Sequence, residues 1–283
     1  MAFLGLGVMG YPMAGHLAAA GHQVTVYNRT PAKAEAWTEE FPGGSHATMP
    51  REAVKGARMV FSCVGNDDDL RSIVLGDDGA FAGMEPGAVF VDHTTASAQV
   101  ARELYAEARK RGLHFIDAPV SGGQAGAVNG QLTVMCGGDQ DVFDQVAPVA
   151  DAFSRAFTYM GACGNGQLTK MVNQICIAGL VQGLSEAIAF GLRAELDVEK
   201  VLDVIGKGAA RAGRWTIAAR PWPWASSTSA LPWTGCARTW AWCSTRPSAM
   251  ARACRSRRWW TSSMATCSRW AAAAGTRPAS SSV

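Results

Sequence analysis

Short apolar segments alternate with longer helical stretches, such as residues 98–111, through the first 160 residues of the chain. This alternation predicts β-strands separated by α-helices. Strands that are apolar on both faces are typical of a parallel sheet covered by helices on both sides. The pattern therefore predicts an α/β fold with a doubly wound parallel sheet of the Rossmann type. Its strands are expected at residues 2–4, 23–27, 59–64, 88–92, 113–117 and 131–136.

A different pattern begins near residue 161. From there to about residue 192, small and apolar residues with little charge predict one long helix. The longest apolar stretch, residues 175–184, is interrupted by Gln182, so no membrane span is predicted. We therefore expect a first domain over residues 1–161 and a second segment, 162–210, that starts with this helix.

The turn after the first strand has the spacing of a phosphate-binding loop. It reads Gly5-Leu6-Gly7-Val8-Met9-Gly10 and leads into a stretch of small residues. In this motif the first glycine permits a tight turn, the second lets a pyrophosphate approach the backbone, and the third lets helix and strand pack closely. A glycine-rich loop without a ligand is the alternative. A signal peptide over residues 2–20 is not expected, because no basic residue precedes the apolar stretch.

The end of the second strand indicates which dinucleotide is bound. In this fold an acidic residue there contacts the free ribose hydroxyls of NAD, whereas an arginine favours the extra phosphate of NADP. The chain has Asn28-Arg29-Thr30, with no acidic residue among the three to compete with the phosphate. We predict NADP, with NAD possible. The alternative is that Arg29 is only a solvated surface residue.

Other predicted strands end in residues that suit the nicotinamide end of a cleft, because ligands bind at the carboxyl ends of such strands. These residues are Val64-Gly65-Asn66 after one strand and Thr94-Thr95 after the next. Ordinary turn chemistry at a strand end is the alternative. Further along, Ser121-Gly122-Gly123 exposes consecutive backbone N–H groups, and such a nest suits a carboxylate. Its alternative is a flexible turn.

The predicted long helix carries Lys170 and Asn173 three positions apart, so they share a face. A lysine on an otherwise apolar helix is costly to bury, so it either extends to water or has a chemical role. An amine in a desolvated site suits proton transfer to and from a hydroxyl. Both interpretations stay open on the pattern alone.

The charge of the chain changes abruptly near residue 211. Residues 1–210 hold 15 Lys and Arg against 23 Asp and Glu, whereas residues 211–283 hold 11 Arg and no acidic residue. That tail also contains nine of the ten tryptophans, but only one Leu and one Ile, too few for an ordinary amphipathic helix or strand-rich core.

Two interpretations of the tail compete. A basic, aromatic segment suits binding to nucleic acid or a membrane. The alternative is translation in the wrong frame, because codons read one base back are compatible with apolar and charged residues at helical spacing. We favour an aberrant, poorly ordered, out-of-frame tail over 211–283, and expect no nucleic acid or membrane partner. The eight cysteines contain no CxxC pair, so we expect reduced thiols in the cytoplasm and no metal site.

Four segments together resemble the 3-hydroxyisobutyrate dehydrogenase family, the β-hydroxyacid dehydrogenases related to 6-phosphogluconate dehydrogenase. They are the glycine turn at 5–10, the segment 117–123 with its Asp-Ala-Pro-Val-Ser-Gly-Gly sequence, the stretch 161–170, and Lys170-Met171-Val172-Asn173. The resemblance covers residues 2–210 and implies an NAD(P)-dependent oxidoreductase. Such an enzyme transfers hydride between nicotinamide and a short 3-hydroxy acid or its semialdehyde, of the 3-hydroxyisobutyrate, tartronate semialdehyde and glyoxylate class.

The resemblance also implies roles for individual residues. Lys170 would be the catalytic lysine, Asn173 would orient the substrate hydroxyl, and Thr95 would lie at the nicotinamide. Ser121, Gly122 and Gly123 would hold the substrate carboxylate. Imine-reductase relatives usually lack a lysine at this position, so Lys170 favours alcohol chemistry.

Members of the family have an all-helical second domain that carries a second pocket lysine in a Lys-Asp-Leu motif. Here that motif is found only out of frame near Ala237 and Arg238, so the domain is expected to be truncated or disrupted. The homo-oligomer expected of the family is in doubt for the same reason. A non-catalytic NADP-binding module and an inactive out-of-frame product remain as alternatives to an active dehydrogenase.

Overall fold

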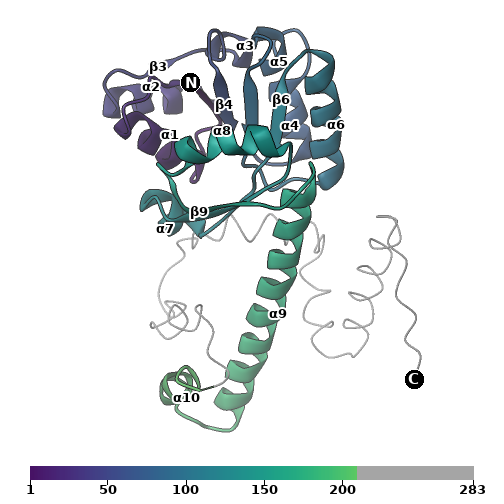
Figure 1. Cartoon of the computed structure of the whole chain (residues 1–283). Helices are drawn as coiled ribbons and strands as arrows, with labels where there is room; N and C mark the ends of the chain where they lie inside the picture. The colour runs from purple at the N-terminus through teal and green to yellow at the C-terminus, as the bar shows by residue number, and fades with distance from the viewer. Residues whose placement is uncertain (209–283) are drawn as a thin grey trace, which may run out of the picture. The chain divides into compact units, whose positions relative to one another are not determined.

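A six-stranded parallel sheet organises the first part of the computed structural model, which describes residues 1–208 (Figure 1). The strand order is β3-β2-β1-β4-β5-β6, and every neighbouring pair is parallel. The doubly wound sheet predicted from the sequence is confirmed. The strands are β1 (Ala2–Leu4), β2 (Thr25–Tyr27), β3 (Ser45–His46), β4 (Met59–Ser62), β5 (Val89–Asp92) and β6 (His114–Asp117).

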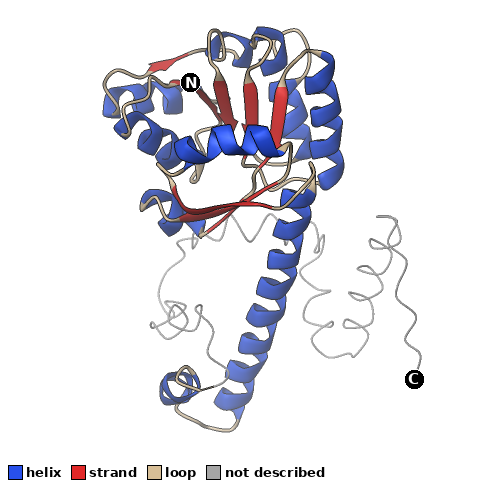
Figure 2. Ribbon diagram, in the orientation of Figure 1, coloured by secondary structure: helices blue, strands red, loops and turns tan. Residues whose placement is uncertain are grey.

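Helices cover both faces of this sheet (Figure 2). Successive residues of β1 point into different hydrophobic clusters, with Phe3 in one and Leu4 in the other. Both faces are therefore buried, which explains why the strands have no polar side. The helices are α1 (Gly10–Ala19), α2 (Pro31–Glu40), α3 (Pro50–Ala53), α4 (Asp67–Val74), α5 (Ala80–Gly83) and α6 (Ala98–Lys110).

A smaller three-stranded sheet follows β6 and corrects one expectation. The run predicted at 131–136 forms β8 (Leu132–Cys136), which lies between β7 (Val120–Ser121) and β9 (Ser154–Tyr159) rather than in the first sheet. No crossover helix separates β6 from β7, so the chain cannot return parallel to β6 there, and β7 instead pairs antiparallel with β8. The helices of this region are α7 (Gly123–Val128) and α8 (Gln140–Ala150).

The predicted long helix is α9 (Asn165–Arg193), and a short α10 (Val198–Ile205) follows it. The buried residues near the start of α9 include Gln167 and Lys170, whereas Val172, Ile175 and Phe190 are exposed. By length and composition alone, α9 is apolar enough to cross a membrane, a test that core helices of soluble proteins also meet. The boundary between residues 161 and 162 stays a prediction, and the predictions for the tail at 211–283 lie outside the described residues.

Candidate active site

The register of the large sheet brings the predicted site segments to one edge. Leu4 pairs with Tyr27 on one side and with Ser62 on the other, and Ser62 in turn pairs with Asp92. Asp92 pairs with Asp117 on the last strand. The loops after these strands therefore start at the same level, and ligands of open α/β sheets bind at this carboxyl edge.

The three glycines of the first turn have three different surroundings. Gly5 has φ +100°, which favours glycine, and a Cβ on it would collide with the Cys63 carbonyl oxygen. A Cβ on Gly10 would collide with the Gly5 carbonyl oxygen and stand 2.9 Å from Phe3 Cε1. A Cβ on Gly7, in contrast, would meet no atom within 4 Å. Protein packing therefore explains Gly5 and Gly10, whereas the space beside Gly7 is open to a ligand.

The start of α1 has the electrostatics of an anion site. No side chain caps it, and its first turn contains no acidic residue. The start of α4 is the opposite case, because Asn66 caps it and Asp67, Asp68 and Asp69 fill its first turn. A helix N-terminus attracts negative charge. The glycine turn and the uncapped α1 together fit the pyrophosphate of a dinucleotide.

The predicted ribose segment has a structural role as well. Asn28 Oδ1 accepts a hydrogen bond of 2.9 Å from the Leu6 backbone N–H, so it ties the glycine turn to the end of β2. Thr30 precedes α2 as its N-cap residue. The Arg29 side chain is 83% exposed and pairs with Asp69, with 2.8 Å between Nη1 and Oδ1.

This ion pair corrects the expectation that no carboxylate competes with a phosphate for Arg29. Asn28-Arg29-Thr30 contains no acidic residue, but the fold supplies a competing carboxylate, Asp69, from α4. Exposed ion pairs contribute about 0–1 kcal/mol, so a phosphate can replace Asp69 at little cost.

In the loop after β4, the predicted site residues form hydrogen bonds within the protein. Asn66 Oδ1 accepts a hydrogen bond from the Asp69 N–H at 2.9 Å, which is an ordinary helix cap. The Val64 N–H donates to Thr94 Oγ1 at 3.1 Å. This loop therefore contacts the loop after β5, in which Thr95 is exposed next to the buried Thr94.

Two buried ionisable residues at the end of β5 were not predicted from the sequence. Asp92 Oδ1 accepts hydrogen bonds from Ser62 Oγ at 2.7 Å and from the Thr94 N–H at 3.1 Å. Burial raises the pKa of Asp92 from 3.8 to about 7. His93 Nδ1 donates to the Ala118 carbonyl at 2.7 Å, and burial lowers the pKa of His93 to about 4, so the ring is neutral near pH 7. Their polarity at a strand end was the only signal in the sequence.

The predicted carboxylate nest has the backbone that the sequence indicates. Gly122 has φ +136° and Gly123 has φ +62°, and both are exposed at the start of α7. Ser121, at the end of β7, is half-buried. These conformations suit glycine and leave the backbone of this turn accessible to a small anion.

The predicted catalytic pair lies on α9. Lys170 is 7% exposed, so its side chain does not lie in bulk solvent. Asn173 is half-buried, and its Nδ2 donates to Gln174 Oε1 at 3.0 Å. The buried start of α9 contacts β6, β8 and α6. These contacts hold the backbone of Lys170 against the Rossmann region of the protein.

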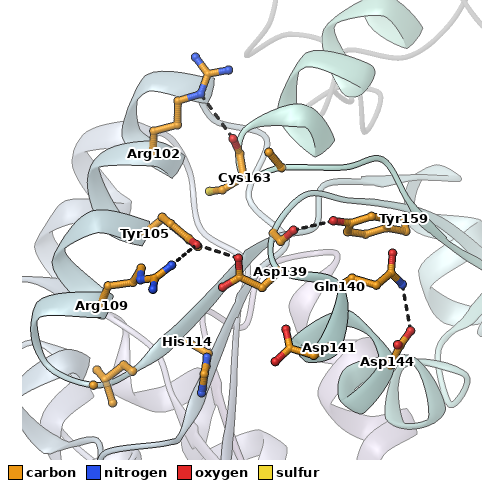
Figure 3. Close-up of a pocket in the computed structure, with 14 residues that line it drawn as sticks. Arg102, Tyr105, Arg109, His114, Asp139, Gln140, Asp141, Asp144, Tyr159 and Cys163 are labelled. Atoms are coloured by element: carbon orange, nitrogen blue, oxygen red, sulfur yellow. Dashed lines mark hydrogen bonds between the residues drawn. The ribbon is translucent and has the colours of Figure 1, made fainter.

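A separate groove of about 1120 Å³ lies between α6, α8 and the segment before α9 (Figure 3). Its polar groups bind one another, since Tyr105 donates to Asp139 Oδ1 at 2.8 Å and accepts a hydrogen bond from Arg109 at 2.9 Å. None of the predicted site residues lines this groove. The glycine turn and the start of α9 therefore remain the candidate active site.

Comparison with known proteins shows the family of the chain. The family described as the NAD binding domain of 6-phosphogluconate dehydrogenase matches residues 1–161. The family described as NAD-binding of NADP-dependent 3-hydroxyisobutyrate dehydrogenase matches residues 164–221. The chain belongs to the 3-hydroxyisobutyrate dehydrogenase family of NAD(P)-dependent oxidoreductases.

Individual relatives of the 3-hydroxyisobutyrate dehydrogenase family agree. An uncharacterized oxidoreductase of Shewanella frigidimarina is 61% identical over 75% of this chain and 72% of its own. A probable 3-hydroxyisobutyrate dehydrogenase-like protein of Arabidopsis thaliana is 44% identical over 74% and 69%. The structure of Mycobacterium tuberculosis 3-hydroxyisobutyrate dehydrogenase with L-serine has a TM-score of 0.68 and 31% identity, covering 75% of this chain and 71% of that one.

Proposed function

We propose that this protein transfers hydride between a nicotinamide cofactor and C3 of a short 3-hydroxy acid, with NADP preferred over NAD. The observation that carries the proposal is the buried Lys170 on the helix that packs against the carboxyl edge of the Rossmann sheet. When bound, the cofactor accepts the hydride in oxidation and returns it in reduction. The chain's own residues orient the substrate and move the hydroxyl proton.

Substrate binding is assigned to the nest and to Asn173. The backbone N–H groups at Ser121, Gly122 and Gly123 are proposed to hold the carboxylate, and the positive φ of both glycines supports this role. Asn173 is proposed to orient the hydroxyl on C3. Holding both ends of a short molecule fixes its C3–H bond in one direction, which is the main contribution of orientation to the rate.

Proton transfer is assigned to Lys170. In oxidation, the C3–H bond breaks as hydride and the O–H bond breaks as the Lys170 amine takes the proton, leaving a carbonyl. In reduction, the ammonium returns the proton to the carbonyl oxygen. General acid–base catalysis contributes about 10²- to 10⁴-fold to such rates. Lys170→Met should therefore lower kcat by that factor while NADPH still binds at the glycine turn.

The preference for NADP is assigned to Arg29. Its guanidinium is exposed at the end of β2 and forms a surface ion pair with Asp69. Guanidinium binds phosphate through paired hydrogen bonds. Because the matching family is described as NADP-dependent, the same preference is expected here.

The activity of this particular chain is proposed to be low. Its last lysine is Lys207, so the second pocket lysine expected of the family is missing. The abrupt change in charge near residue 211 supports an out-of-frame tail. We expect the chain to bind NADPH yet turn over slowly, which keeps a non-catalytic NADP-binding protein as the second candidate.

The test is hydride transfer from NADPH to tartronate semialdehyde, succinic semialdehyde and glyoxylate, and the reverse reaction with 3-hydroxyisobutyrate and L-serine. We compare three proteins: this chain, its Lys170→Met variant, and a version with residues from 211 onward restored to frame. The restored version should oxidise NADPH much faster than this chain. Equal activity of the two would contradict the proposed impairment. Equal activity with and without Lys170 would contradict the proton-transfer role.

A further inference from the structure

A buried carboxylate anchors the start of α9. Asp117, the last residue of β6, is fully buried. Its Oδ1 accepts a hydrogen bond from the Gly164 N–H at 2.7 Å, and its Oδ2 accepts one from the Gln167 N–H at 2.9 Å. Gly164 is the N-cap residue of α9 and Gln167 lies in its first turn, where N–H groups otherwise lack a partner. Asp117 therefore holds the position of the helix N-terminus against the sheet.

Two glycines make this close approach possible. A Cβ on Gly166 would stand 2.8 Å from Asp117 Oδ2, and a Cβ on Gly137 would stand 2.6 Å from Asp117 Oδ1. Any larger residue at either position would push the carboxylate and the helix apart. The glycine-rich sequence before Lys170 thus serves contact with Asp117, which the sequence pattern alone did not show.

The side chain of Gln167 continues the connection to another loop. Gln167 is fully buried, its Nε2 donates to the Thr94 carbonyl at 2.7 Å, and its Oε1 accepts a hydrogen bond from the Ala96 N–H at 3.0 Å. One primary amide thus binds two backbone groups of one loop. Because it uses a donor and an acceptor at once, only one orientation of the amide satisfies both.

Gln167 thus links α9 to the loop after β5, and each of these two segments carries a residue proposed to act on the substrate or the cofactor. Thr95 lies between the two backbone groups that Gln167 binds, and Lys170 is three residues after Gln167 on α9. The Val64 N–H reaches the same loop by donating to Thr94 Oγ1. Contacts therefore run without a break from the loop after β4, through the loop after β5, to the helix of Lys170.

We propose that Gln167 is a positioning residue that sets the distance between Lys170 and the nicotinamide-side loop at Thr95. The inference rests on the proposed function, because it assumes that Lys170 and Thr95 face the same reacting atoms. A displacement of about 1 Å can lower a rate by about 10²-fold, and residues that orient catalytic groups typically contribute 10- to 100-fold. A purely structural role would change stability without changing the pH dependence of hydride transfer.

The decisive variant is Gln167→Glu, measured in the full chain and in the version restored to frame. As a neutral acid, the new side chain can donate to the Thr94 carbonyl and accept from the Ala96 N–H, as glutamine does. As a carboxylate it can no longer donate and is repelled by that carbonyl. Hydride transfer under single-turnover conditions should be near the wild-type rate at low pH. It should fall about 10- to 100-fold as the pH rises, beyond any change in the wild-type protein.

Gln167→Met supplies the companion measurement, because it keeps the length of the side chain and loses both hydrogen bonds. We expect a 10- to 100-fold loss of rate at every pH, with the Kd of NADPH within about threefold of wild type. The matched controls are Gln145→Glu and Gln145→Met on the exposed side of α8, which should leave rate and pH profile unchanged. A Gln167→Glu pH profile equal to wild type would overturn the proposal even if Gln167→Met does not fold.

Two measurements keep the inference testable if neither the full chain nor the version restored to frame turns over. Hydrogen exchange at the Ala96 amide should accelerate in Gln167→Met, since that N–H loses its acceptor. The fluorescence of bound NADPH should report a changed nicotinamide environment at unchanged affinity. If the version restored to frame binds NADPH without turnover, the proposed function fails, while these two measurements still test whether Gln167 positions the loop at Thr95. Unchanged fluorescence in Gln167→Met, or no NADPH binding by wild type, would overturn it.

Discussion

Asp92→Asn tests whether a buried, uncompensated carboxyl group at the end of β5 makes the fold less stable as the pH rises. Asp92 is fully buried, and its Oδ1 is satisfied by Ser62 and by the Thr94 N–H. Its Oδ2 has no hydrogen-bond partner within the described part of the chain. Ionising this group inside the protein is therefore unfavourable. Asparagine keeps the Oδ1 acceptor and removes the ionisation.

The sign of the effect follows from the raised pKa. Burial raises the pKa of Asp92 in the folded protein from 3.8 to about 7. The folded state therefore binds more protons than the unfolded state between these values, and stability falls as the pH rises through that window. At about 1.4 kcal/mol per pKa unit, the full loss amounts to about 4 kcal/mol. The Asp92→Asn variant would not lose this stability, because its side-chain amide does not titrate.

The assay is urea unfolding of both proteins, followed by circular dichroism at pH 5, 6, 7 and 8. We plot the difference in the free energy of unfolding between variant and wild type, in which effects of other residues largely cancel. His93, whose pKa burial lowers to about 4, destabilises the fold toward acid in both proteins. Burial raises the pKa of Asp117 to about 6, so ionisation of Asp117 lowers the stability of both proteins as the pH rises.

Between pH 5 and pH 8 the difference should change by about 3 kcal/mol in favour of Asp92→Asn, because about two of the roughly three pKa units of the shift lie in that window. The two proteins should be close only below about pH 4, where Asp92 is protonated in the folded and unfolded states alike, since each then buries one N–H or O–H group without an acceptor, at about 1–3 kcal/mol. Asp144→Asn, on the exposed side of α8, is the matched control for the substitution. A change for Asp92→Asn no larger than that of the control would refute the reasoning.

Three further predictions concern the cofactor site. Gly7→Ala should leave the urea midpoint nearly unchanged but raise the Kd of NADPH at least about tenfold in a fluorescence titration, because its Cβ meets only open space; unchanged affinity would mean that no phosphate approaches there. Gly10→Ala should instead lower the free energy of unfolding by about 1–3 kcal/mol, since its Cβ collides with the Gly5 carbonyl, and a wild-type urea midpoint would contradict this. Arg29→Ala should change stability by less than about 1 kcal/mol and weaken NADPH more than NADH, whereas equal weakening of both would exclude a phosphate contact.

The parts of the fold that follow from local sequence were predictable. The apolar runs of β1, β4, β5 and β6, the glycine turn and the long α9 all depend on periodicity or on residues adjacent in the chain. The roles of Gly5 and Gly10 in turn and packing were also predicted, and the structure bears out this geometry. Local steric limits on φ and ψ act in any context, so such features can be inferred without coordinates.

Other features depended on pairings that the pattern does not encode. β8 is as apolar as the strands of the first sheet, and only the absence of a crossover helix before β7 places it in the second. The carboxylate of Asp69 reaches Arg29 across 40 positions of sequence. The order of the strands decides whether two such distant segments meet. That order in turn depends on the packing of both hydrophobic clusters.

The sequence by itself determined that the chain forms a dinucleotide-binding sheet and has a lysine on its long helix, because spacing and composition are local properties. Only the tertiary structure decided that Asp117 and Gln167 join that helix to the loop beside Thr95. Asp117 binds the backbone at the start of the helix and the Gln167 side chain binds the loop after β5, because parallel register brings the ends of β5 and β6 to one edge and buried polar groups need hydrogen-bond partners.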